Sequence, residues 1–467
     1  MKRIYLVIFA ALCVMTASAQ AKYVFYMIGD GMGANQVLAT EMYLAEIQGK
    51  IGREKLCMTQ FPYSGQAATF SHSNGITDSS AAGTCLASGK KTNNHVLGLD
   101  ENGNPVHTIA EILHENDWSV GVMTSVSIDH ATPGAFYAHS SSRSDYYSIG
   151  CQLAKSGFDF FGGGTFYQPY DKKNPNGSPN VYDLCREAGY KIAHGYQEFK
   201  FVEDAERAIL IQAHEGREKD YLGEGLLPYA IDKKADDLTL PQITTAAVDF
   251  LSRKGKPFFM MVEGGAIDWA CHSNDAATVI GEVLEFDEAI KVAYKFYMVH
   301  PGETLIVVTA DHETGGMALG NSNYTLNLKA LQNQKLSIDQ LSEEVKKLHE
   351  TYGKKLKWQQ VKDLLREKLG LYGAVEVSAE DDAELQKQFK LMLANKSKDE
   401  KSLYASHSAI SKKAIKVLDK AAKIGWTTGS HSASAVPVFA VGVGAELFTG
   451  WHDNSEIMPL ILKAVQL

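Results

Sequence analysis

The chain has 467 residues, of which 45% are hydrophobic and 22% are charged, and its formal net charge is −9 at pH 7. This is ordinary globular composition, long enough for one large α/β core or for two or three smaller domains. The mild acidity argues against a nucleic-acid-binding protein, which usually carries a basic stripe, but it leaves an anionic substrate open because bound cations can reverse the local field.

The first 19 residues have the pattern of a secretory signal peptide. Lys2 and Arg3 form a positive start, residues 4–15 are an apolar run too short to span a bilayer comfortably, and residues 17–19 are a small-residue cleavage site. An N-terminal core helix is the alternative. The pattern predicts a periplasmic or secreted protein that starts at residue 20, and we expect no membrane or lipid anchor in the C-terminal segment. The five cysteines left after cleavage lack a Cys-x-x-Cys spacing, so no disulfide framework is predicted. One or two disulfide bridges in an oxidising compartment are the alternative.

Short, nearly continuous apolar runs along the chain predict strands that are buried on both faces. They are rich in Val, Ile, Phe and Tyr, and helical stretches such as residues 278–299 lie between them. The combination predicts an α/β fold, with a sheet covered by helices. The predicted strands are residues 22–28, 119–123, 258–262, 304–310 and 436–441.

Asp30 follows the first predicted strand, between Gly29 and Gly31. Open α/β sheets place ligands at this carboxyl end of a strand. The two oxygens of one carboxylate can bridge two metal ions there. The alternative is an aspartate that caps the next helix, and no Gly-x-Gly-x-x-Gly dinucleotide pattern is present.

Thr77-Asp78-Ser79 opens a helix of small residues that is expected to run to about Lys90. A serine at a helix start lies among unpaired N–H groups and near the positive end of the helix dipole, which suits a phosphate and stabilises an alkoxide. Ser79 is therefore a candidate nucleophile. Serine and aspartate are also the commonest N-caps, so a purely structural role is the alternative.

Thr132 precedes Pro133, as an N-cap precedes the first helical residue, and Arg143 is expected about three turns further on. The planar guanidinium of an arginine can hold two phosphate oxygens at once. Arg143 is thus a candidate phosphate ligand, with a surface salt bridge as the alternative.

Carboxylates and histidines follow the next two predicted strands. Glu263 leaves the tip of the strand at 258–262, and Asp268 and His272 are four residues apart, so a helix would place them on one face at a spacing that suits two ligands of one zinc ion. Asp311 and His312 follow the strand at 304–310 and offer an adjacent carboxylate and imidazole.

Between residues 318 and 424 the composition shifts to Lys, Glu, Gln and Leu. We interpret this segment as a largely helical insertion on the carboxyl-end face of the sheet, and Ser337 with Gln340 is placed as a capping box. The charged faces of these helices are expected to be solvated, and a lid or partner surface is the alternative. Helical spacing is clearest in Ile338, Leu341, Val345 and Leu348.

These motifs together resemble the alkaline phosphatases and occur in the same order along the chain. The resemblance runs from about Tyr23 to the end, with residues 318–424 only loosely covered. The segments that carry it are Asp30 in Gly-Asp-Gly-Met-Gly, Thr77-Asp78-Ser79, Thr132 with Arg143, Glu263 with Asp268 and His272, Asp311-His312, and His431 before Val436-Pro437-Val438.

The resemblance implies one catalytic domain over residues 20–467, a three-layer α/β/α sandwich with a central, mostly parallel sheet. It implies hydrolysis of phosphate monoesters through a phosphoserine on Ser79, with Arg143 on the phosphate oxygens. Members of the family are often dimeric, so a homodimer is one expectation. The implied cofactors are a zinc held by Asp30, Asp311 and His312, a second zinc held by Asp268, His272 and His431, and a magnesium held by Asp30, Thr132 and Glu263.

Two departures from the family pattern bear on the third metal. His130 stands where some members carry an aspartate near magnesium, and Trp269 stands where some carry lysine or histidine. They leave open whether magnesium or zinc fills this site.

The last histidine ligand has two possible alignments. Residues 427–429 could replace the family's His-Thr-Gly, but alignment on the strand at 436–441 gives His431, which we favour because the site needs a ligand. A phosphodiesterase or phosphonate hydrolase with the same metal core, and a non-catalytic metal-binding relative, are the alternative functions.

Overall fold

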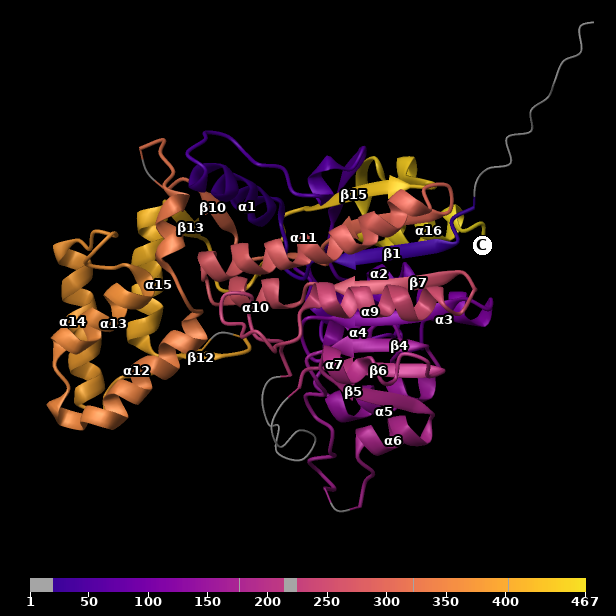
Figure 1. Ribbon diagram of the computed structural model, residues 1–467, viewed down its shortest axis with the longest axis horizontal. Helices are drawn as coiled ribbons and strands as arrows, with labels where there is room; N and C mark the ends of the chain where they lie inside the picture. The colour runs from indigo at the N-terminus through magenta and orange to yellow at the C-terminus, as the bar shows by residue number, and fades with distance from the viewer. Residues whose placement is uncertain (1–19, 176, 214–224, 322, 402) are drawn as a thin grey trace, which may run out of the picture.

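The computed structural model describes residues 20–175, 177–213, 225–321, 323–401 and 403–467 (Figure 1). The signal peptide predicted at residues 1–19 lies outside this part of the chain. One ten-stranded sheet forms the centre, in the order β16-β2-β15-β8-β1-β7-β3-β4-β6-β5. Its strands are β1 (Tyr23–Ile28), β2 (Tyr63–Ala68), β3 (Ser119–Thr124), β4 (Phe160–Gly163), β5 (Tyr190–His194), β6 (Arg207–Ile211), β7 (Phe258–Glu263), β8 (Thr304–Thr309), β15 (Val436–Gly442) and β16 (Gly450–Asp453).

Nine of these ten strands run in one direction, and β15 is antiparallel to both of its neighbours, β8 and β2. The four adjacent strands β8, β1, β7 and β3 are almost wholly buried. Their apolar runs pack against helices on both faces, which is why they show no alternation along the sequence. The predicted strands and the predicted α/β class with a mostly parallel sheet are confirmed.

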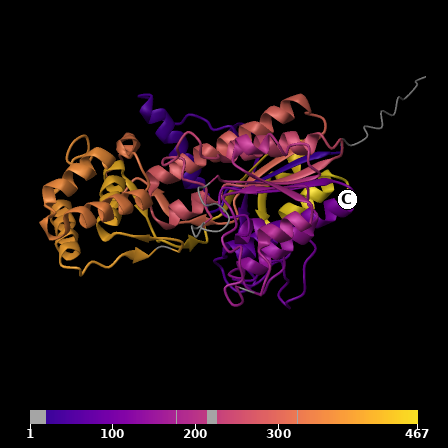
Figure 2. The ribbon, with the colours of Figure 1, turned by 60° about the horizontal axis from the view of Figure 1, so that its bottom comes forward.

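Helices cover both faces of the sheet and complete the three layers. On one face α9 and α11 pack against each other, and α2, α4 and α5 lie on the opposite face (Figure 2). The helices outside the insertion are α1 (Ala34–Ile47), α2 (Ser79–Ser88), α3 (Ile109–Glu115), α4 (Ala131–Gly134), α5 (Tyr146–Ser156), α6 (Val181–Glu187), α7 (Tyr196–Phe199), α9 (Leu240–Ser252), α10 (Ala266–His272), α11 (Ala276–Val299) and α16 (Asn454–Ala464), with 3-10 turns η1 (Met58–Gln60) and η4 (Ala445–Phe448).

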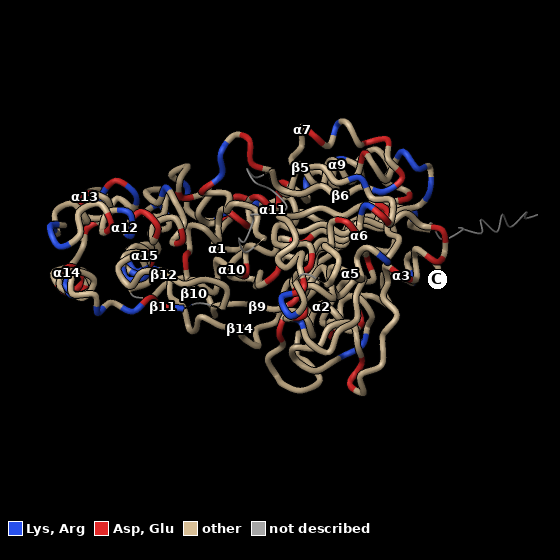
Figure 3. The backbone as a smooth tube through the Cα atoms, turned by 90° about the horizontal axis from the view of Figure 1, so that it is seen from below, with Lys and Arg blue, Asp and Glu red and all other residues tan. Residues whose placement is uncertain are grey.

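The segment predicted as an insertion forms a group of helices beside the sheet (Figure 1). Its two ends meet in the antiparallel pair β10 (Met317–Leu319) and β13 (Ile424–Trp426), in which Leu319 lies opposite Ile424. Basic and acidic residues are interspersed along these helices (Figure 3). The other elements are η2 (Leu328–Asn333), α12 (Ile338–Tyr352), η3 (Gly353–Lys355), α13 (Trp358–Leu369), α14 (Ala379–Leu393), β11 (Glu400–Lys401), β12 (Ser406–His407) and α15 (Ala409–Ala422).

The start of α12 is held by carboxylates from outside the insertion. The Ser337 hydroxyl accepts from the Gln340 amide at 3.3 Å, as expected, but the reciprocal half of the predicted capping box is wrong. The Ser337 amide instead donates to Asp232 at 2.9 Å, and the Ile338 amide donates to Asp275 at 2.9 Å. A partner from another segment has displaced the local one, so the first turn of α12 is tied to the main body.

The described cysteines are all unpaired thiols, namely Cys57, Cys85, Cys151, Cys185 and Cys271. Four of them are buried. None of the helices in the described ranges is both long enough and apolar enough to span a membrane.

Candidate active site

The ends of adjacent parallel strands bring the predicted ligands together. Asp30 follows β1, Glu263 ends β7, and Asp311 with His312 follows β8, and all four are fully buried. With His130 at the N-cap of α4, two residues of α10, and His431 of β14 (His431–Ser432), which pairs with β9 (Glu313–Thr314), they form three groups whose candidate ligand atoms lie within 4.8 Å of one another. The groups are Asp30, Asp311 and His312; Asp268, His272 and His431; and Asp30, His130 and Glu263.

The first group lies beside Ser79. His312 Nε2 is 3.3 Å from Asp30 Oδ1, 3.2 Å from Asp311 Oδ2 and 3.1 Å from Ser79 Oγ. Gly31 lets α10 lie close to this group, because its φ is 72° and a Cβ there would lie 2.9 Å from the Asp268 Cα. The group can therefore place a cation next to a serine hydroxyl.

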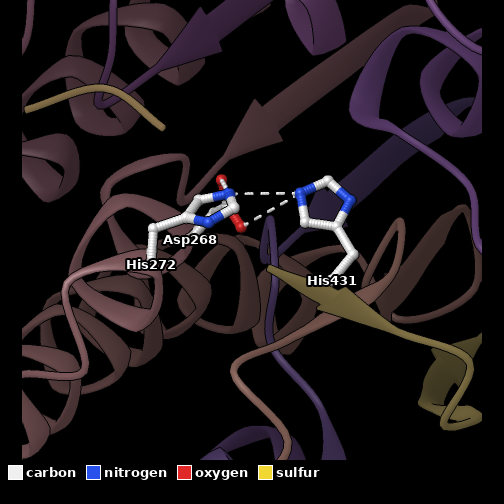
Figure 4. A group of neighbouring side chains, drawn as sticks. All are labelled: Asp268, His272 and His431. Carbon is white, nitrogen blue, oxygen red and sulfur yellow. Dashed lines mark hydrogen bonds and ion pairs between the residues drawn. The ribbon is translucent and has the colours of Figure 1, made fainter. Parts of the chain in front are cut away.

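The second group joins α10 to β14 (Figure 4). His272 Nε2 lies 3.3 Å from Asp268 Oδ2 and 3.2 Å from His431 Nε2. The Nδ1 atoms point outward, to the carbonyl oxygens of Gly429 at 2.7 Å from His272 and of Thr77 at 2.8 Å from His431. A carbonyl only accepts, so both rings carry their proton on Nδ1 and direct bare Nε2 atoms at each other, as ligands of a metal ion do.

His431 reaches this group through a short strand pair. In β9–β14, His431 lies opposite Thr314, only two residues after His312, and the two imidazole rings stack with centroids 3.6 Å apart. The competing segment, residues 427–429, instead supplies the Gly429 carbonyl that orients His272. The structure thus places His431, and not that segment, among the candidate ligand atoms.

The third group contains an imidazole that was expected only beside it. His130 offers a ligand atom together with Asp30 and Glu263, while Thr132 Oγ1 lies 3.4 Å from Asp30 Oδ2. The predicted N-cap at Thr132 is wrong, because α4 begins at Ala131 and His130 is its N-cap. Thr132 is instead the second residue of α4, and its hydroxyl faces Asp30.

The donor set fits bound cations. One oxygen of each central carboxylate is buried without a hydrogen-bond partner: Asp30 Oδ1, Glu263 Oε1, Asp268 Oδ2 and Asp311 Oδ2. Unpartnered buried carboxylate oxygens are costly unless a cation satisfies them. All three groups combine carboxylate with imidazole, a donor set that suits zinc.

The ionisation of these groups agrees with this interpretation. Burial, followed by repulsion from Asp311, raises the pKa of Asp30, and burial raises the pKa of Glu263 to about 8. Burial lowers the pKa of His431 to about 4 and that of His130 to about 3. His130 and His431 are thus neutral and able to bind metal at neutral pH, and the two acids need a positive partner to ionise fully.

Ser79 is the first residue of α2, and its neighbour caps the helix. The Asp78 carboxylate accepts from the Ala81 amide at 3.0 Å, so Asp78 and not Ser79 is the N-cap. Ser79 is fully buried and its hydroxyl faces His312. The structural alternative proposed for Ser79, that of a cap, therefore does not hold.

Arg143 is buried, so its alternative as a surface salt bridge is wrong. Its Nη1 donates to Asp78 Oδ2 at 3.2 Å, and its Nη2 donates to the hydroxyl of Tyr404 at 2.9 Å. Burial disfavours the charged form of Asp78, but Arg143 and nearby hydrogen bonds hold the pKa of this carboxyl below its usual value. These residues line a cavity of about 370 Å³ together with His130, Trp269 and His431.

Three residues of this site were missed by sequence reasoning. Thr124, at the end of β3, donates to Glu263, and Thr314 donates to Asp268. Thr124 ends a buried strand and Thr314 stands two residues after His312, and these positions could have drawn attention to them. Tyr404 comes from the insertion, where a lone tyrosine between Leu403 and Ala405 carries no recognisable signal. Trp269 stacks on Tyr404, with ring centroids 4.4 Å apart.

Comparison with known proteins gives consistent matches over the whole described length. The family model for alkaline phosphatase matches residues 21–467. Alkaline phosphatase 4 of Bacillus subtilis is 30% identical over 464 residues, which cover 96% of this chain and 89% of that protein. The cold-active alkaline phosphatase of a psychrophilic Shewanella species has a TM-score of 0.77 at 27% identity, over 95% of this chain and 99% of that one. A histidine-to-aspartate mutant of TAB5 alkaline phosphatase, with Mg bound in its M3 site, has a TM-score of 0.67 at 25% identity, over 96% of this chain and 99% of that one.

Proposed function

This chain belongs to the alkaline phosphatase family and is a phosphomonoesterase, and on that premise we propose that it acts through a phosphoserine on Ser79 with two zinc ions and one magnesium ion. The observation that carries the proposal is the position of the Ser79 hydroxyl. It is buried, starts a helix, and lies 3.1 Å from His312, one of the candidate metal ligands.

The chain's own residues account for binding and orientation. The positive end of the α2 helix dipole and the guanidinium of Arg143 both favour a phosphate dianion. Ser79 Oγ attacks phosphorus, the ester oxygen leaves and takes up a proton as the alcohol, and water then cleaves the serine–phosphate bond to release inorganic phosphate and restore Ser79. The bound zinc ions would supply Lewis acidity toward the attacking and leaving oxygens.

We assign one zinc to Asp30, Asp311 and His312, and the other to Asp268, His272 and His431. Magnesium is proposed at Asp30, Thr132 and Glu263. His130 adds an imidazole to this third group, and imidazole favours zinc over magnesium. The TAB5 mutant that has Mg in its M3 site carries aspartate in place of a histidine, which supports a link between this ligand type and the choice of metal.

The experiment compares an aryl phosphate monoester with a diester, using purified protein before and after chelation. We expect turnover of the monoester, lost on chelation and restored by zinc and magnesium. Ser79→Ala should abolish turnover, whereas the matched control Ser88→Ala, at the other end of α2, should keep it. Activity in Ser79→Ala would refute the phosphoserine intermediate. A strong preference for the diester would refute the monoesterase in favour of a diesterase or phosphonate hydrolase.

We further propose that the protein is exported, with residues 1–19 removed, and that it forms a homodimer. The first proposal rests on the N-terminal sequence pattern. The protein recovered from the periplasm or medium should begin at Gln20, and light scattering should give the mass of two chains. Recovery of an uncleaved cytoplasmic form, or the mass of one chain, would contradict the respective proposal.

A further inference from the structure

We propose that Tyr404, a residue of the insertion, is a positioning residue that holds the Arg143 guanidinium in the orientation in which it binds phosphate. The inference rests on the role of Arg143 proposed above and extends it. It gives the insertion a part in the reaction that its solvated charged faces do not suggest.

Tyr404 lies just before β12, where the chain leads from the insertion toward the main body (Figure 1). The residues that follow Tyr404 are anchored on α12. His407 on β12 is paired with Asp339, and the Ser408 amide donates to Ser342 at 3.1 Å. The helices of the insertion therefore fix one end of a short segment whose other end contacts Arg143.

The tyrosine ring is held by a second set of contacts. It stacks on Trp269 with centroids 4.4 Å apart and an angle of 10° between the planes. Its ring centroid lies 5.5 Å from that of His130 and 5.4 Å from that of His272. Since Trp269 follows the ligand Asp268 on α10, the ring is aligned with the same helix that carries two ligands of the second group.

Arg143 is consequently held from two sides. Nη2 donates to the Tyr404 hydroxyl at 2.9 Å, and Nη1 donates to Asp78 at 3.2 Å. A third contact, of Nη2 with His130 Nε2, is longer at 3.4 Å. A guanidinium has five N–H donors, so at least two are left for phosphate oxygens.

The absence of charge on the Tyr404 hydroxyl matters as much as its position beside Arg143. A carboxylate in the position of the Tyr404 hydroxyl would neutralise the positive charge that attracts the phosphate. A neutral hydroxyl accepts the hydrogen bond and leaves that charge in place, beside the one carboxylate of Asp78. Loss of the hydroxyl would leave Nη2 without its shortest hydrogen bond, and a long flexible side chain would then sample orientations that do not fit the phosphate.

Tyr404→Phe tests this inference, because it keeps the ring and removes only the hydroxyl. We expect about a tenfold loss in kcat/KM for an aryl phosphate and a similar loss in affinity for inorganic phosphate, in the range that interacting pairs commonly show. Phosphate binding is measured by calorimetry on the metal-loaded protein and as product inhibition. Tyr372→Phe is the matched control, since it removes another hydroxyl of the insertion, which donates to Asp382 at 2.7 Å, and it should leave both quantities within about twofold.

A double-mutant cycle separates positioning from direct contact. In an Arg143→Ala background, Tyr404→Phe should have almost no further effect on phosphate affinity, because the group that it positions is gone. A full additional loss there would overturn the inference in favour of a direct contact of Tyr404 with substrate. If Tyr404→Phe binds phosphate with wild-type affinity, this inference is overturned and the proposed function is not. If the unaltered protein has no monoesterase activity, both the proposed function and this inference are overturned.

Discussion

Removal of the bound cations should make the stability of this protein fall as the pH rises from about 5 to 8, more steeply than in the metal-loaded form. In the metal-free protein, burial raises the pKa of Glu263 from 4.5 to about 8. Between these values the folded state keeps a proton that the unfolded chain releases. Because the folded state holds more protons, the free energy of unfolding decreases as the pH rises through this interval.

The magnitude follows from the same shift. At 1.36 kcal/mol per pKa unit, the change from 4.5 to about 8 corresponds to about 5 kcal/mol, fully lost above pH 8. For a chain of this length, about 2 °C or less in Tm accompanies each kcal/mol, so a decrease on the order of 5–10 °C is expected. A bound cation replaces the proton on Glu263 and removes this contribution.

Thermal unfolding is recorded at pH 5, 6, 7 and 8 on protein dialysed free of metal and on protein reloaded with zinc and magnesium. Glu263→Gln should remove most of the difference in slope between the two forms. Glu282 is the matched control, because burial also raises its pKa to about 8 but it lies outside the metal groups, so Glu282→Gln should change both slopes equally. Parallel slopes for the two wild-type forms would refute the assignment of Glu263 as a metal ligand.

Three substitutions test the remaining parts of the site. Arg143→Ala should weaken inhibition by inorganic phosphate about 100-fold, since a charged hydrogen-bonding partner is lost, and an unchanged inhibition constant would exclude its role. His130→Asp should raise the magnesium content relative to zinc, because a carboxylate replaces an imidazole, and metal analysis showing the same ratio would contradict this. His431→Ala should remove one zinc per chain and lower kcat by about 100-fold or more, and a full complement of zinc would show that His431 is not a ligand.

Much of the fold and of the site was accessible from the sequence because parallel strands share one edge. Asp30, Glu263 and Asp311 each follow a buried apolar run, and a parallel sheet aligns the ends of such runs. The spacing of Asp268 and His272 likewise translates directly into one turn of α10. Local patterns of this kind carry their three-dimensional meaning within a few residues.

The errors arose where a distant segment decides the local structure. The capping box at Ser337 is incomplete because Asp232 takes the amide that Gln340 was expected to bind. Thr132 faces Asp30 instead of capping a helix. Tyr404 reaches Arg143 from 261 residues away, and no periodicity or motif in the sequence records such a contact.

The neck formed by β10 and β13 also bears on the order of folding. His312 and His431 are 119 positions apart, and closing a loop of that length costs about 4 kcal/mol of chain entropy. Once Leu319 has paired with Ile424, only a few residues on each side separate the two histidines from the neck, and the remaining closure costs about 2 kcal/mol. Folding of the insertion therefore brings β14, with His431, close to the candidate metal ligands that precede the insertion in the chain. Hydrogen-exchange labelling during refolding should accordingly show that the β10 and β13 amides become protected before those of β14.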